Sequence, residues 1–195
     1  MAKKVLVAYT TNAGSTAEVA QAVGEEIRTT GHTVDILRLE EVASVRAYDA
    51  VIIGAPMILG WHRSAVQFVR HHQKDLAQKK VAFFCTLISL TDVNLDLTQA
   101  GPVNIDPRLA KLPQNPGRLS LKERYATLSN YLKPLIKAAP AVQPMRIGFF
   151  GGKLELFRLK WWQMLFVMVI IQAKPGDLRN WEFIEEWAAD VGTCL

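Results

Sequence analysis

The sequence predicts an α/β protein built on a doubly wound parallel sheet, and three features of the chain lead to this prediction. Short runs that are apolar on both faces alternate with amphipathic helical segments along the first half of the 195 residues. Runs of this kind are typical of buried parallel strands, and their alternation with helices is typical of βαβ units. A hydroxyl-rich loop also follows the first run directly, at the strand end where such folds bind ligands.

The expected elements follow from this alternation. Ser15 and Glu18 form a capping-box pattern that predicts a helix start, and Gly31 predicts the end of that helix. A second helix is expected to place Ala65, Phe68, Val69 and Leu76 on its apolar face, and a last helix begins near Asn180. The expected strands span residues 5–9, 34–39, 51–54, 81–85 and 145–150.

The region between the fourth and fifth strands is less regular. Residues 87–119 are rich in proline and glycine and are expected to form a long loop. Ser120 and Glu123 form a second capping box, which predicts a helix that Pro134 ends or kinks. We therefore expect one domain over residues 1–195, with a loop-plus-helix insertion at 87–144 and a basic, apolar segment at 153–177.

Composition excludes several classes of protein. The chain is 50% hydrophobic and 21% charged, which is typical of a globular domain and argues against intrinsic disorder. Cys85 and Cys194 lie far apart, which excludes a disulfide scaffold and argues against a zinc cluster, and Cys85 is expected to be an inert core residue. The N-terminus does not resemble a signal peptide and no apolar run is long enough to span a membrane, so a cytoplasmic protein is expected.

The loop Thr10–Thr16 has the chemistry of an anion site. It combines hydroxyl groups, a glycine and the start of a helix, but it contains no lysine or arginine. It also lacks the lysine of a nucleoside triphosphate loop and the GxGxxG pattern of a dinucleotide loop. A single terminal phosphate held by hydrogen bonds suits it best, and the alternative is an ordinary turn that caps a helix.

This loop resembles the Ser/Thr-x-Thr-Gly-x-Thr phosphate loop of flavodoxins, which hold FMN. Thr11, Gly14 and Thr16 match the pattern, while Ala13 replaces its middle threonine. The resemblance implies a flavodoxin-like five-stranded sheet of order 2-1-3-4-5. The stretch 53–64 and the C-terminal stretch 175–187 further resemble the menaquinone-dependent protoporphyrinogen oxidase branch of that family.

The resemblance implies a set of cofactor-binding residues in three loops. The phosphate is expected at Thr10, Thr11, Asn12, Ala13, Gly14, Ser15 and Thr16. The flavin ring is expected to border Met57, Ile58, Leu59, Gly60, Trp61 and His62, and also Thr86, Leu87, Ile88, Ser89 and Leu90.

Particular side chains in and near these loops carry two interpretations each. Trp61 is the candidate for stacking on the flavin, and the alternative is an aromatic side chain partly exposed under the long loop. His62 either hydrogen-bonds the flavin or a substrate carboxylate, or it is an ordinary surface histidine. His71 and His72 are expected to be solvated. The pattern shows no metal cluster and identifies no catalytic acid or base.

The net charge of +5 favours an anionic partner. The expected ring loop, residues 55–64, contains Arg63 and no acidic residue, whereas electron-carrier flavodoxins are typically acidic. Nearby positive charge stabilises an anionic reduced flavin, which favours a two-electron acceptor. No nucleic-acid-binding motif accompanies the basic residues.

Basic and apolar residues concentrate in residues 154–173, which include Trp161 and Trp162. Such a segment suits peripheral contact with anionic lipid at the inner face of the cytoplasmic membrane. A helix buried in the core and a homo-oligomer interface are the alternatives.

By resemblance, the expected function is FMN-dependent oxidation of protoporphyrinogen IX, an anionic tetrapyrrole, to protoporphyrin IX with a quinone acceptor. The alternatives are a flavodoxin-type electron carrier between redox proteins and a non-catalytic FMN-binding protein.

Overall fold

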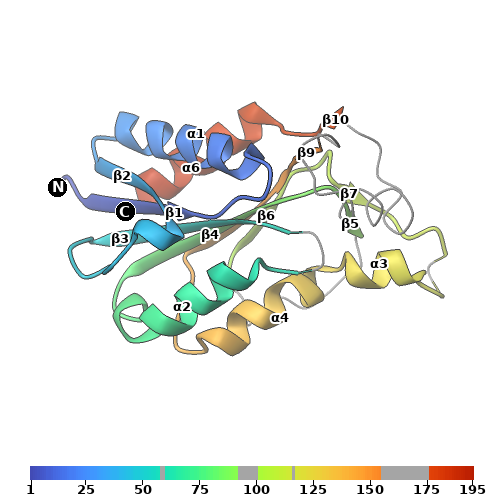
Figure 1. Ribbon diagram of the computed structural model, residues 1–195. Coiled ribbons are helices and arrows are strands. Elements are labelled where there is room, and N and C mark those ends of the chain that lie inside the picture. Colours follow the sequence, from blue (N-terminus) through green and yellow to red (C-terminus); the bar gives the residue numbers. More distant parts are fainter. Residues whose placement is uncertain (58–59, 92–100, 116, 155–175) are drawn as a thin grey trace.

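A parallel sheet forms the centre of the protein in a computed structural model that describes all residues except 58–59, 92–100, 116 and 155–175 (Figure 1). Its strand order is β2-β1-β3-β4-β8-β6. The strands span β1 (Lys4–Tyr9), β2 (Thr33–Arg38), β3 (Ala50–Pro56), β4 (Lys80–Leu87), β6 (Val103–Ile105) and β8 (Arg146–Gly151). The first five strands in this order confirm the expected doubly wound sheet, and β6 extends it by one edge strand.

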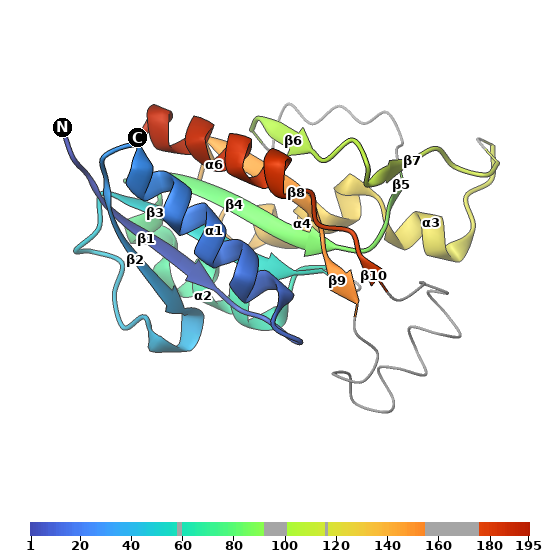
Figure 2. The ribbon, with the colours of Figure 1, turned by 90° about the horizontal axis from the view of Figure 1, so that it is seen from above.

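Two pairs of helices cover the two faces of the sheet (Figures 1 and 2). Helices α1 (Ser15–Thr29) and α6 (Trp181–Cys194) cover one face, and α2 (Arg63–Leu76) and α4 (Leu128–Ala138) cover the other. Alternate residues of β1 enter two separate cores: Leu6 packs on the α2–α4 side and Val7 on the α1–α6 side. Burial on both faces explains why these strands read as continuous apolar runs.

The stretch 87–119 was expected to be a loop, and this expectation is wrong where short strands form within it. It contains β5 (Leu90–Thr91), β6 and β7 (Ala110–Lys111), and α3 (Leu121–Tyr125) follows it. Strand β6 pairs in parallel with β8, and β5 pairs in parallel with β7. Strands of two or three residues are too short to produce an alternating pattern, so only their pairing partners define them.

The remaining short elements lie at the carboxyl edge of the sheet or after β2. A 3₁₀ turn, η1 (Leu39–Glu41), follows β2. Strands β9 (Lys153–Leu154) and β10 (Gly176–Asp177) form an antiparallel pair, and they directly precede and follow residues 155–175 in the sequence. The chain that leaves β10 passes close over the end of β8, where Leu178 N donates to Gly152 O at 3.0 Å. This contact brings the start of α6 to the ligand-binding edge of the sheet.

The two expected capping boxes have different outcomes. Helix α1 begins at Ser15 as expected, but its N-cap is Gly14 and no side chain caps it, so the first capping box is wrong. Glu18 instead forms an ion pair with Arg179, a partner that is distant in the sequence. The second box is confirmed, because Glu123 accepts a bond of 2.7 Å from Ser120 N and donates its own amide to Ser120 Oγ at 3.3 Å.

Pro134 was expected to end or kink the helix, and the first of these two outcomes is wrong, because α4 continues past it. The helix runs through Pro134 to Ala138. The helical structure is interrupted earlier, between the end of α3 and the start of α4. Proline removes one backbone donor from the helix. Burial of Leu128, Leu132 and Leu135 against the sheet offsets this loss.

Candidate functional site

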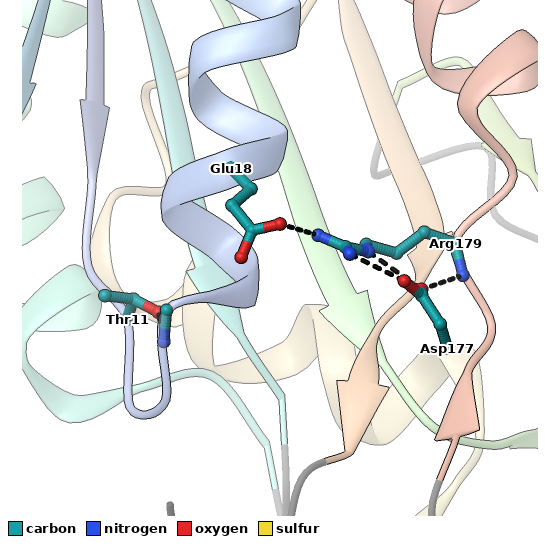
Figure 3. Close-up of polar contacts among 5 residues, drawn as sticks. Thr11, Glu18, Asp177 and Arg179 are labelled. Atoms are coloured by element: carbon teal, nitrogen blue, oxygen red, sulfur yellow. Dashed lines mark hydrogen bonds and ion pairs between the residues drawn. The ribbon is translucent and has the colours of Figure 1, made fainter.

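The loop from Thr10 to Thr16 joins the carboxyl end of β1 to α1, and hydrogen bonds hold it near both of its ends. Thr10 N donates to Gly54 O of β3 at 3.0 Å. Gly14 has a φ of 96°, which favours glycine, and its amide donates to Thr11 Oγ1 at 2.9 Å (Figure 3). Because the Thr11 oxygen is an acceptor in this bond, the Thr11 hydroxyl can donate its own proton to a ligand.

The start of α1 supplies backbone donors to the same loop. The amides of Ala17 and Glu18 both donate to Gly14 O, which begins the helical hydrogen-bonding pattern. Amides at the first positions of a helix, here Ser15 and Thr16, have no acceptor within the helix. Together with the positive end of the helix dipole they form a site for an anion. These donors fit a phosphate group.

A buried pair of hydroxyl groups connects this loop to β4. Thr16 Oγ1 lies 2.8 Å from Thr86 Oγ1, and the two residues are 0% and 4% exposed. One hydroxyl donates to the other, so the pair keeps one proton for a third acceptor. The structure thus brings together two residues that were predicted for different parts of the cofactor.

The loop after β3 is the second expected cofactor segment, and its described residues are held close to Thr86. Met57 N donates to Thr86 O at 2.9 Å, and Met57 forms an antiparallel bridge to Trp61. Gly60 has a φ of +118°, which allows the turn between them. Ile58 and Leu59 lie outside the described residues.

Trp61 is packed into the core and is 6% exposed. Its ring meets the ring of Phe83 edge-on, with 5.7 Å between centroids, and its Nε1 is buried with no hydrogen-bond partner among the described residues. Stacking of Trp61 on the flavin therefore stays a prediction. The alternative of a partly exposed aromatic does not match this burial.

His62 precedes α2 and is half-buried. Its Nδ1 lies 2.8 Å from Ser64 Oγ, an assignment that leaves the tautomer open. Burial lowers the pKa of His62, while the charge of Glu40 opposes this shift. A neutral imidazole at pH 7 suits hydrogen bonding, and whether its partner is the flavin or a substrate stays a prediction.

The third expected segment, residues 86–90, is anchored by neighbouring elements. Leu87 and Leu90 are each 1% exposed, whereas Ile88 and Ser89 are half-buried. Leu87 O accepts from Gly152 N at 2.8 Å, and Ser89 O accepts from the Tyr131 hydroxyl at 3.2 Å. Within residues 87–90, Ile88 and Ser89 are therefore the more accessible to a ligand.

Arg179 and Asp177 lie beside the phosphate loop and were not predicted as site residues. Arg179 Nη1 reaches Glu18 Oε2 on α1 at 2.6 Å, and its Nη2 reaches Asp177 Oδ2 at 2.6 Å (Figure 3). The Arg179 hydrogen bonds lower the pKa of Asp177 and keep it ionised. The available sequence signal was an arginine in an otherwise acidic tail, where Asp177, Glu182, Glu185, Glu186 and Asp190 also lie.

Two further expectations concern buried groups away from this site. His72 was expected to be solvated but is 8% exposed, with its ring 4.5 Å from that of Phe68, so this expectation is wrong. Its position four residues after Phe68 places it on the buried face of α2. Cys85 is fully buried as expected, and burial raises the pKa of its thiol.

The buried His72 predicts a loss of stability in mild acid. Burial is the main cause that lowers the pKa of His72, with a smaller contribution from His71, while Asp75 opposes it. A histidine whose pKa is lowered by folding stabilises the folded state fully above its unfolded pKa, and this contribution is lost as pH falls below that value. Urea unfolding at pH 7.5 and pH 5 should show a smaller acid-induced loss for His72→Phe than for the wild type.

The exposed neighbour His71 provides the matched control for this measurement. His71→Phe leaves His72 buried, so most of the acid-induced loss should persist. Equal acid sensitivity of His72→Phe and the wild type would contradict the assignment.

Two findings for the described residues concern metal ions and membrane spans. Among the described residues, no group of three or more histidine, cysteine or acidic side chains is placed to hold a metal ion. In the same parts of the chain, no helix has the length and apolar character needed to span a membrane. The segment 154–173, expected at a lipid surface or an interface, falls almost entirely outside the described residues.

The fold and the anion loop together define a flavodoxin-like, FMN-binding class of protein. The chain belongs to the flavodoxin domain family, whose family model matches residues 6–179. FMN is accordingly its cofactor. The residue-by-residue assignment of the site remains our prediction.

Known proteins similar to this chain are distant from it in sequence. Protoporphyrinogen IX dehydrogenase [quinone] of Escherichia coli strain K12 is 22% identical, over 96% of this chain and 94% of that protein. Oxidised flavodoxin 1 from Bacillus cereus has a similar structure, with a TM-score of 0.53 and 14% identity over 98% of this chain and 99% of that one. A short-chain flavodoxin associated with a bacterial microcompartment aligns at a TM-score of 0.52, with 12% identity over 100% of this chain and 99% of that one.

Proposed function

We propose that this protein is an FMN-dependent oxidoreductase that oxidises protoporphyrinogen IX to protoporphyrin IX and passes the electrons to a quinone. The observation that carries the proposal is the similarity to protoporphyrinogen IX dehydrogenase [quinone], which extends over 96% of this chain and 94% of that protein. An oxidoreductase role also agrees with membership of the flavodoxin domain family.

The residues of the site have distinct roles in this proposal. Thr11, Thr16 and the first amides of α1 hold the phosphate, and the loops after β3 and β4 border the ring. Bound FMN supplies the acceptor for successive two-electron oxidations of the porphyrinogen. The buried Met57 and Leu87 keep water from the inner side of the two ring loops.

Charge near the ring favours oxidation of an anionic substrate over one-electron transport. The loop 55–64 contains no acidic residue, and Arg63 is exposed at the start of α2. A positive charge there attracts propionate groups and stabilises an anionic reduced ring. Contact of residues 154–173 with anionic lipid, which would bring the protein to a membrane quinone, belongs to the same proposal.

Anaerobic mixing of the FMN-loaded protein with protoporphyrinogen IX tests the proposal. The visible absorbance band of the flavin should bleach, porphyrin fluorescence should rise in parallel, and a menaquinone analogue should restore the band. Free FMN at the same concentration is the control for direct reduction in solution. No bleaching by the porphyrinogen would contradict the proposed function.

A flavodoxin-type electron carrier is the second candidate, favoured by the structural similarity to the Bacillus cereus flavodoxin. A carrier would instead be reduced by a flavodoxin reductase and would not react with the porphyrinogen.

A further inference from the structure

Arg179 is enclosed between α1 and the chain that enters α6, with 5% of its side chain exposed. Its guanidinium binds Asp177 in a bidentate manner, through Nε to Oδ1 at 2.8 Å and Nη2 to Oδ2 at 2.6 Å. It also lies over the ring of Trp181, 4.5 Å from the ring centroid. The planar guanidinium is therefore held in one orientation before it contacts α1.

The third contact of Arg179 is with the phosphate-binding end of α1. Arg179 Nη1 donates to Glu18 Oε2 at 2.6 Å, and Glu18 belongs to the first turn of that helix. Side chains of an α-helix point toward its N-terminus. Figure 3 shows the Glu18 carboxylate directed toward the loop end of α1, on the side from which Arg179 approaches.

This direction creates an electrostatic conflict for an anionic ligand. A carboxylate near the start of a helix and a phosphate at the same helix end repel each other. The loop from Thr10 to Thr16 contains no basic residue that could offset this repulsion. Of the described ion pairs, the one between Arg179 and Glu18 is the pair that sets a positive charge against Glu18, and Arg179 shares this charge with Asp177.

The fold holds Arg179 in place from the side of α6 and the sheet. Asp177 lies in β10, which pairs with β9. Leu178 passes so close over Gly151 that a Cβ at Gly151 would collide with the Leu178 carbonyl group. Asn180 Nδ2 donates to the buried Asp106 at the end of β6, at 3.2 Å. These contacts fix the residues on both sides of Arg179.

We propose that Arg179 is a positioning residue for the FMN phosphate, which places a positive charge against the Glu18 carboxylate at the loop end of α1 and so reduces its repulsion of the phosphate. The inference rests on the FMN site of the proposed function and does not depend on the substrate. Arg179 acts on the phosphate through Glu18, so its effect should be specific to the phosphate group of the ligand and insensitive to the flavin ring.

Comparison of FMN with riboflavin, which lacks the phosphate, tests this specificity. Flavin fluorescence titrations give both dissociation constants for the wild type and for Arg179→Gln. FMN binding should weaken by about tenfold in Arg179→Gln, because two carboxylates then lose their counter-charge. Riboflavin binding should change by less than about twofold, since the described contacts of Arg179 are with Asp177, Glu18 and Trp181 and not with the described residues of the ring-binding loops.

A second substitution distinguishes charge neutralisation from a general role in folding. Glu18→Gln combined with Arg179→Gln should recover most of the lost FMN affinity, because the repelling carboxylate is then absent. Raising the salt concentration should also narrow the difference between Arg179→Gln and the wild type. Equal losses for FMN and riboflavin, or no recovery in the double variant, would overturn the proposal.

The ion pair at the other end of α6 provides the matched control. Arg146 Nη2 contacts Asp190 Oδ2 at 2.6 Å, and both residues lie away from the phosphate loop. Arg146→Gln should leave the ratio of the FMN and riboflavin dissociation constants unchanged. Arg179→Lys, which keeps the charge, should have a ratio closer to the wild type than Arg179→Gln.

Glu18→Gln alone keeps the test decisive if Arg179→Gln does not fold. This variant keeps the Arg179–Asp177 pair and should bind FMN at least as tightly as the wild type, whereas weaker FMN binding would overturn the proposal. All these measurements use protein without substrate, so the absence of porphyrinogen oxidation would not affect their outcome.

Discussion

Replacing Thr16 by valine is expected to weaken FMN binding by about 1.5–3 kcal/mol, which corresponds to roughly 10- to 150-fold in affinity. Valine has nearly the shape of threonine, so the α1 start should keep its packing. The substitution removes the Thr16 hydroxyl, the member of the buried Thr16–Thr86 pair that lies at the start of α1 and that we expect to donate to the phosphate. Hydrogen bonds to a charged acceptor are the stronger class, which explains the size of the effect.

The Thr16 prediction is checked by fluorescence titration with FMN and with riboflavin. The loss should appear with FMN and be small with riboflavin. Thr29 is the matched control, because it lies at the other end of α1 and its hydroxyl donates to Glu26 O at 2.7 Å. Thr29→Val should bind FMN like the wild type, and unchanged FMN affinity in Thr16→Val would mean that the phosphate loop is assigned wrongly.

Truncation of Trp187 to alanine is expected to lower the free energy of unfolding by about 3–5 kcal/mol. Trp187 is 3% exposed on α6 and packs against Phe84 and Phe150, with 5.2 Å between its ring centroid and that of Phe150. These rings fill the core between the sheet and the α1–α6 layer. Alanine would leave a cavity there that the surrounding strands cannot close.

Phenylalanine at position 187 separates the contribution of packing from that of the indole N–H. The Trp187 Nε1 atom is buried with no hydrogen-bond partner among the described residues, so its removal should cost little. Trp187→Phe should therefore lose clearly less stability than Trp187→Ala, because the phenyl ring keeps most of the packing and leaves a smaller cavity. Urea denaturation measures both variants, and equal losses for alanine and phenylalanine would contradict the packing argument.

The central sheet could be predicted because its longer strands are recognisable from their own residues. Strands such as β1 and β3 are buried on both faces, so their buried residues form continuous apolar runs that are visible without a partner strand. The position of the anion loop was predictable for a related reason, since the carboxyl ends of parallel strands meet at one edge. Strand β6 was not predictable, because three residues show no period and only pairing with β8 defines them.

In the candidate site, too, the features formed by neighbouring residues were predictable, and the contacts between distant residues were not. The loop from Thr10 to Thr16 is local in sequence, and its hydroxyl groups and glycine identified it before the fold was known. The partner of Glu18 was assigned wrongly, because a capping box is a local pattern whereas Arg179 is 161 positions away. The burial of Trp61 against Phe83 and of His72 against Phe68 likewise depends on packing between elements.

The sequence by itself determined the class of fold, the order in which strands and helices alternate, and the anion loop. Each of these depends on residues that are neighbours in the chain. The tertiary structure alone decided that Thr16 meets Thr86, that Arg179 meets Glu18, and that β6 extends the sheet. These contacts join residues that lie far apart in the chain, and packing of the helices on the sheet brings them together. The net charge of +5 does not reveal this arrangement, because its effect depends on which carboxylate each arginine contacts.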